Sequence, residues 1–172
     1  MRKIGLACFA ALLWCFPSPA APAAESGGLT SPDHWTSAAS PELLAELAGG
    51  IQHLDPQDSR ALARSGHLLL RAGKTAEAAK AFDLAQKSDP KDDEAFVLIA
   101  MAYSEKKMWA EADRWFASAV ERDPKDVDHK IEWGVSYWNR GDKKKAAELF
   151  VKAIQDEPKN GRILDKIGRG IN

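Results

Sequence analysis

The stretch AAKAFDLAQKSDP at residues 78–90 recurs in altered form 34 residues later as ADRWFASAVERDP at 112–124, and again as AAELFVKAIQDEP at 146–158. In every copy an alanine, a phenylalanine, a second alanine and a final proline keep their places. A fixed period of this length is typical of stacked helical hairpins, because each unit buries its apolar face only against its neighbours. The repeat therefore predicts an α-helical array.

The residues around the repeat support two helices in each unit. Ala78 and Phe82 stand four residues apart, so they share one helical face, and the large rings of Phe82, Phe116 and Phe150 are expected to fill the space between hairpins. The proline that ends each unit cannot continue a helix. Ala, Leu, Glu, Lys and Arg dominate, and no period-two apolar run appears after residue 30, so strands are not expected.

The three units resemble the tetratricopeptide repeat, whose pattern is a large residue, a Leu-like residue, Gly, Tyr, Ala, Phe, Ala and Pro. The first unit reads Leu62, Ser65, Gly66, Leu69, Ala78, Phe82, Ala85 and Pro90. The second reads Phe96, Ile99, Ala100, Tyr103, Ala112, Phe116, Ala119 and Pro124. The third reads Lys130, Trp133, Gly134, Tyr137, Ala146, Phe150, Ala153 and Pro158. The departures are Ser65, Lys130 and Lys107, the last where a mid-hairpin Gly is usual.

This resemblance implies an all-α fold, a right-handed α-solenoid of three hairpins at residues 59–92, 93–126 and 127–160. A half-repeat helix is expected over residues 41–56, because Ser40 is a good N-cap and Pro41 suits the first helical position. Residues 161–172 are expected to form a C-terminal capping helix that stops at Gly170. Such end helices cover the apolar faces that a repeat array leaves exposed.

Residues 1–24 have the layout of a secretory signal peptide. Arg2 and Lys3 precede an apolar run over residues 4–16, and small residues stand at Ala21 and Ala23. The run is too short to span a bilayer, so we expect cleavage and a periplasmic or secreted protein. Residues 25–40 are rich in Gly, Ser, Thr, Pro and Ala and are expected to form a flexible leader.

Both cysteines, Cys8 and Cys15, lie within the predicted signal peptide, so the mature chain would contain none. Lipid attachment at Cys15 is the alternative, since Leu12 stands three residues before it. Trp14 argues against lipid attachment, because the processing pattern requires a small residue there.

The composition argues against catalysis and against nucleic acid as a partner. The chain has 24 Lys and Arg against 25 Asp and Glu, without a basic stripe. The four histidines are scattered, with no ligating partner at helical spacing, and no nucleophile or phosphate-binding motif is present. We therefore predict a non-enzymatic protein without a metal, cofactor or small-molecule substrate.

The resemblance implies that the first helix of each repeat lines a concave face where a partner binds. We assign three rows of residues to the concave face: Ala63, Val97 and Ile131; His67, Met101 and Val135; Leu70, Ser104 and Trp138. Arg60, Glu94 and Asp128 mark one edge, and Arg71, Glu105 and Asn139 mark the other. Relatives that bind a C-terminal carboxylate use Lys and Asn in the first two rows, so that function is not transferred.

The apolar rows predict binding of an amphipathic helix or an apolar extended segment of an envelope protein. If these rows face solvent, Glu in place of Val97 or Ile131 would abolish binding without changing stability. Two alternatives stay open: the leader around Trp35 or a second copy of the chain occupies the rows. In the second case the protein would be a self-associating structural subunit of an envelope assembly.

Overall fold

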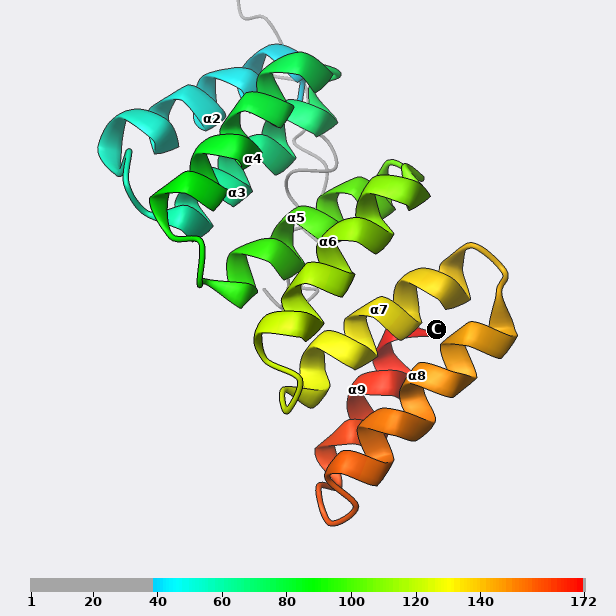
Figure 1. Cartoon of the computed structure of the whole chain (residues 1–172). Helices are drawn as coiled ribbons and strands as arrows, with labels where there is room; N and C mark the ends of the chain where they lie inside the picture. The colour runs from blue at the N-terminus through cyan, green and yellow to red at the C-terminus, as the bar shows by residue number, and fades with distance from the viewer. Residues whose placement is uncertain (1–38, 172) are drawn as a thin grey trace, which may run out of the picture. The chain divides into compact units, whose positions relative to one another are not determined.

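The computed structural model describes residues 39–171, in which all regular secondary structure is α-helical (Figure 1). The predicted signal peptide and all but the last two residues of the predicted leader lie outside the described residues. The helices are α2 (Pro41–Leu54), α3 (Ser59–Arg71), α4 (Thr75–Ser88), α5 (Asp93–Glu105), α6 (Trp109–Arg122), α7 (Val127–Asn139), α8 (Lys143–Asp156) and α9 (Arg162–Gly170). None of these helices is both long and apolar enough to cross a membrane.

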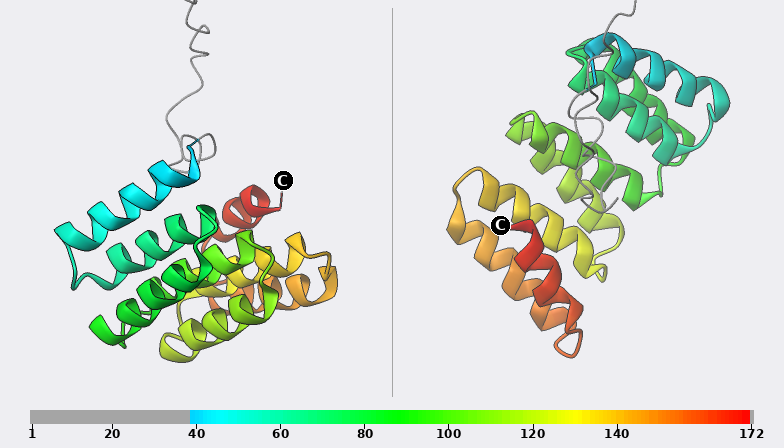
Figure 2. Two further views of the ribbon diagram at one scale, coloured as in Figure 1. Left: turned by 90° about the horizontal axis from the view of Figure 1, so that it is seen from above. Right: turned by 180° about the vertical axis from the view of Figure 1, so that it is seen from behind.

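The helices form three consecutive hairpins, which pair α3 with α4, α5 with α6, and α7 with α8. Figures 1 and 2 show neighbouring hairpins side by side, and α3 packs directly on α5. Helix α2 lies against α3, and α9 lies against α7 and α8. The predicted all-α solenoid of three hairpins with a further helix at each end is confirmed.

Aspartates begin the first helix of every hairpin. Asp58, Asp92 and Asp126 are N-caps whose side chains accept hydrogen bonds from backbone N–H groups of α3, α5 and α7. Each carboxylate satisfies a donor that has no partner inside the helix and lies at the positive end of the helix dipole. Ser40 caps α2 in the same way, with Pro41 following, as predicted from the sequence.

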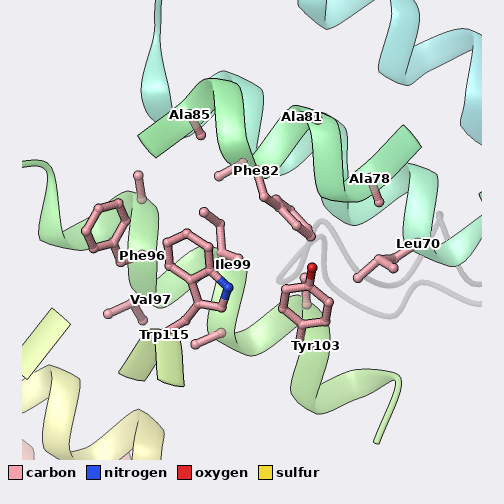
Figure 3. Close-up of a cluster of buried hydrophobic side chains, with 14 of the residues drawn as sticks. Leu70, Ala78, Ala81, Phe82, Ala85, Phe96, Val97, Ile99, Tyr103 and Trp115 are labelled. Atoms are coloured by element: carbon pink, nitrogen blue, oxygen red, sulfur yellow. The ribbon is translucent and has the colours of Figure 1, made fainter. Parts of the chain in front are cut away.

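The repeated phenylalanines lie in the core, where Phe82 and Phe116 are 1% exposed. Phe82 of α4 reaches Tyr103 of α5, with ring centroids 5.1 Å apart (Figure 3). Gly66 allows this ring to lie close to α3, since a Cβ at position 66 would stand 2.3 Å from Cε1 of Phe82. The small residue and the ring therefore act as a pair.

Two residues that depart from the repeat pattern have specific polar partners. The hydroxyl of Ser65 is fully buried, donates to the carbonyl of Ala48 at 3.0 Å and accepts from the amide of Gln52 at 2.7 Å. Lys130 is also buried, and its ammonium lies 2.7 Å from a carboxylate oxygen of Asp156. Buried polar groups need hydrogen-bond partners, and both residues have them, so these departures from the repeat pattern are accommodated in the core.

The buried apolar side chains form two clusters within the described residues. The larger one extends from α2 to α6, and the smaller one belongs to α7, α8 and α9. Trp133 packs against both clusters and is stacked on Phe116 at a centroid distance of 6.3 Å. The apolar core is therefore divided between the second and third hairpins, and Trp133 joins its two parts.

Candidate binding groove

A cavity of about 270 Å³ lies where the first helices of the hairpins meet. Its lining residues come mainly from α5 and α7, with contributions from α3 and α6: His67, Met101, Ser104, Glu105, Phe116, Glu132, Val135, Ser136 and Asn139. We call this cavity the groove. Met101, Phe116 and Val135 provide its apolar surface, and two carboxylates, two hydroxyls, an imidazole and an amide provide its polar surface.

Polar contacts join each first helix to the next along this face. Nε2 of His67 on α3 lies 2.5 Å from a carboxylate oxygen of Glu105 on α5. The hydroxyls of Ser104 on α5 and Ser136 on α7 are 2.8 Å apart. At the far end Lys166 of α9 lies 3.5 Å from Glu132. The groove therefore has polar contacts between its helices and an apolar centre. Its two carboxylates, those of Glu105 and Glu132, already have hydrogen-bonding or cationic neighbours.

A further contact between α3 and α5 lies at the edge of this face. The guanidinium Nε of Arg60 is 3.1 Å from both carboxylate oxygens of Asp92, and the hydroxyl of Ser59 donates to the same carboxylate at 2.5 Å. Burial alone would raise the pKa of Asp92, but the hydrogen bonds from Arg60 and Ser59 outweigh it and lower the pKa below its usual value.

The groove contains the central row of the three predicted rows. His67 and Val135 are half-buried, and Met101 is 42% exposed, so Met101 is the most accessible residue of this row. Ser104 of the third row also lines the groove. These four residues are the predicted partner-binding residues that the structure brings together there.

Four predicted binding residues are instead buried in the core, and their assignment to an open face was wrong. Ala63, Val97 and Ile131 are 0%, 8% and 1% exposed, and Leu70 is 3% exposed. Val97 and Leu70 belong to the larger apolar cluster, part of which is drawn in Figure 3, and Ile131 belongs to the smaller one. A carboxylate at Val97 or Ile131 would therefore be buried by folding itself and would destabilise the protein.

Trp138 has a different neighbourhood from the one predicted. It is half-buried against the cluster of α7 to α9, and the ammonium of Lys143 lies 3.1 Å from its ring centroid. It is not among the residues that line the groove. The ring therefore holds the turn between α7 and α8, where a cation over an aromatic face is favourable.

Glu132, Ser136 and Phe116 line the groove although the sequence did not assign them to it. Glu132 and Ser136 follow the predicted residues Ile131 and Val135 of α7 by one position, which is about 100° around the helix, so on α7 the groove lies to one side of the predicted face and shares Val135 with it. Glu105 and Asn139 were expected only at an edge. The concentration of polar residues at positions 132, 136 and 139 of α7 is the signal that could have located the open face.

His129 has carboxylate neighbours that were not predicted from the sequence. Nε2 of buried His129 lies 3.2 Å from Asp93 and 3.4 Å from Asp126, and the three side chains could together contact a metal ion. Nδ1 of His129 is buried without a hydrogen-bond partner. A metal-bound histidine normally donates its other N–H to an acceptor, so this arrangement fits an imidazole whose Nε2–H donates to the carboxylates.

Comparisons with known proteins agree with this fold. Residues 69–130 match the family model of the tetratricopeptide repeat. The chain is similar to the crystal structure of YrrB, described as a TPR protein with an unusual peptide-binding site, at 24% identity and a TM-score of 0.53. That alignment covers 72% of this chain and 66% of YrrB, slightly less than two thirds of the neighbour's length.

A second similar structure is MamA MSR-1 C2, at 16% identity and a TM-score of 0.47, with 80% of this chain and 81% of that chain covered. No curated protein matches the chain in sequence. The family match covers residues 69–130, and the YrrB likeness is a likeness of fold. This fold supports a protein–protein interaction module.

Proposed function

We propose that the protein is a non-catalytic scaffold that binds a peptide segment of an envelope protein in the groove. The observation that carries this proposal is the groove itself, where exposed Met101 lies beside Val135 and is surrounded by polar groups on three successive first helices. Apolar surface next to a few convergent polar groups is the usual composition of a ligand site. YrrB has a peptide-binding site on the same fold.

The lining residues indicate the chemistry of the peptide. An apolar side chain would contact Met101 and Val135, and Met adapts to differently shaped partners because its side chain is unbranched and polarizable. Glu105 and Glu132 can accept further hydrogen bonds from Lys, Arg or backbone N–H groups, because a carboxylate accepts several at once. An apolar residue flanked by basic residues therefore suits the groove better than the wholly apolar segment predicted from the sequence.

The envelope location in this proposal rests on residues 1–24, which have the layout of a secretory signal. N-terminal sequencing of the protein recovered from its cell tests it. A start near residue 25 is expected, and a lipid-modified Cys15 would replace the soluble location with a lipid-anchored one.

Selection from a random peptide display library tests the groove. Peptides that bind the wild-type protein are expected to carry one apolar residue with Lys or Arg nearby, and to bind Met101→Glu at least about tenfold more weakly, since the new carboxylate would be desolvated by the apolar side chain. Leu84→Glu is the matched control, because Leu84 is similarly exposed but lies on α4 outside the groove. Equal binding to the Met101→Glu variant would contradict the proposed site.

A further inference from the structure

The helix at each end of the repeat series corresponds to one half of a hairpin, and the two ends have different halves. Helix α2 spans Pro41–Leu54, 34 residues before α4, so it corresponds to the second helix of a hairpin. Helix α9 begins at Arg162, 35 residues after the start of α7, so it corresponds to a first helix. Within the described residues, α2 has no first helix before it and α9 has no second helix after it.

In a complete hairpin, one contact between the two helices recurs at fixed positions. Phe96 of α5 packs edge-on against Trp115 of α6 with centroids 5.2 Å apart, as Figure 3 shows, and both side chains are buried. Leu62 and Ala81 hold the same two positions in the first hairpin and are also buried, and in the third hairpin these positions are buried Lys130 and half-buried Leu149. In the first two hairpins this pair of positions is therefore where first and second helices bury apolar surface against each other.

The end helices carry leucines at these two positions, and both are exposed. Leu164 of α9 stands 68 residues after Phe96 and is 65% exposed, and Leu47 of α2 stands 68 residues before Trp115 and is 46% exposed. Among the described residues, each leucine therefore occupies a position that is buried in the first two hairpins and has no helix packed over it. Leu43, one turn before Leu47 on α2, is exposed to a similar degree.

The two end helices also differ in charge. Helix α2 carries Glu42 and Glu46 and no Lys or Arg, whereas α9 carries Arg162, Lys166 and Arg169 against the single acid Asp165. Opposite charges favour contact between α2 and α9 and disfavour contact of either helix with its own kind. Lys166 is already paired with Asp128 and Glu132 of α7. The difference in net charge therefore favours a pair of unlike end helices over a pair of like ones.

We propose that copies of this chain associate end to end, with α9 of one copy and α2 of the next packing as a hairpin in which Leu164 contacts Leu47. The junction continues the series of alternating first and second helices from one copy into the next. Such a contact uses different surfaces on the two copies, so it produces rings or open chains and not only dimers. It involves neither the groove nor its peptide and does not depend on the proposed function.

The experiment uses the protein purified from its own cell, after any N-terminal processing. Its molar mass is measured by light scattering and sedimentation over a concentration series. Wild type is expected to form species larger than dimers as concentration rises. Leu47→Glu and Leu164→Glu should each remain monomeric, because a charge would be desolvated in the junction. Leu84→Glu, which changes an exposed leucine of an internal helix, should associate like wild type.

The decisive sample is a mixture of the two end variants. Leu47→Glu keeps an intact α9 face and Leu164→Glu keeps an intact α2 face, so together they should form a one-to-one heterodimer and nothing larger. Self-association of either variant alone would overturn the proposal in favour of a symmetric contact. A wild-type protein that stays monomeric throughout, as it would if its own N-terminal segment covered α2, would overturn it as well. Circular dichroism checks that both variants are folded, and Leu47→Gln is the milder substitute if Leu47→Glu is not.

Discussion

Lys107 adopts a backbone conformation that L-residues rarely take. Its φ is +59° at the turn between α5 and α6, where the other two hairpins have Gly73 at +79° and Gly141 at +91°. A side chain in this left-handed region costs about 1–2 kcal/mol, which glycine avoids. The departure from the repeat pattern noted in the sequence therefore has a physical cost at this residue.

Lys107→Gly is expected to stabilise the protein by about 0.5–1 kcal/mol, because relief of the left-handed strain exceeds the extra entropy that glycine loses on folding. Urea denaturation measures the difference. Gly73→Lys is the reciprocal control and should destabilise the first hairpin by a similar amount. If Lys107→Gly lowered the unfolding free energy, the strain argument would be wrong.

Phe116 contributes both to the core and to the groove. Its ring is 1% exposed, stacks on Trp133 and forms part of the groove lining. Phe116→Ala is expected to cost about 3–5 kcal/mol, because the cavity left by the ring adds to the lost burial. Reversible denaturation checks this, with the exposed Leu84→Ala as a control expected to change stability by less than about 0.5 kcal/mol. A loss below about 1 kcal/mol would show that the ring is not packed there.

One capping residue also connects two neighbouring helices. Asp92 caps α5 and also accepts hydrogen bonds from Ser59 and Arg60 of α3, so one carboxylate holds two neighbouring first helices together. Its lowered pKa means that the folded state favours the ionised form. A carboxyl group of this kind stabilises the fold above its unfolded-state pKa, near 4, and the contribution is lost as pH falls through the folded-state value.

Asp92→Asn should therefore destabilise the protein more at about pH 7 than at about pH 3, where the wild-type carboxyl group loses its charge as well. Urea denaturation of both proteins at the two pH values provides the comparison. Arg60→Gln tests the cause, since removal of the guanidinium should shift the loss of wild-type stability to higher pH. An equal difference between wild type and Asp92→Asn at both pH values would contradict the assignment.

At the scale of the whole described region, the junction between the second and third hairpins is polar. Asp113 of α6 accepts hydrogen bonds from Nε1 of Trp133 at 2.9 Å, from the hydroxyl of Tyr137 at 3.4 Å and from Arg140 at 2.9 Å. Partly buried Trp133 packs against both apolar clusters here. Because repeat arrays are stabilised through neighbouring contacts, this junction should open before the larger core does.

Asp113→Ala is expected to destabilise the junction by about 2 kcal/mol, since it removes the acceptor for the partly buried indole N–H of Trp133 and the partner of Arg140. Amide hydrogen exchange resolves where the effect falls. Protection should decrease in α7, α8 and α9 and stay nearly unchanged in α3 and α4. A uniform decrease over all the described helices would show that the array unfolds as one unit.

The positions of the helices could be predicted from the sequence because the contacts that define them recur every 34 residues. The pairing of a small residue with a ring, as in Gly66 and Phe82, is local within one hairpin, and so are the caps and the prolines. Such features need no knowledge of distant residues. The N-cap Ser40 and Pro41 at the start of α2 are local in the same sense.

Which side of each first helix stays open was decided only by the tertiary structure. A shift of one residue turns the exposed face by about 100°, and the repeat pattern does not state how far each helix is rotated against its neighbour. Ile131 is therefore buried, whereas Glu132, one residue later on α7, is half-buried and lines the groove. The contact of Asp93 with His129, and of Asp113 with three residues of the next hairpin, likewise depends on packing between repeats, which brings together side chains that no period in the sequence relates.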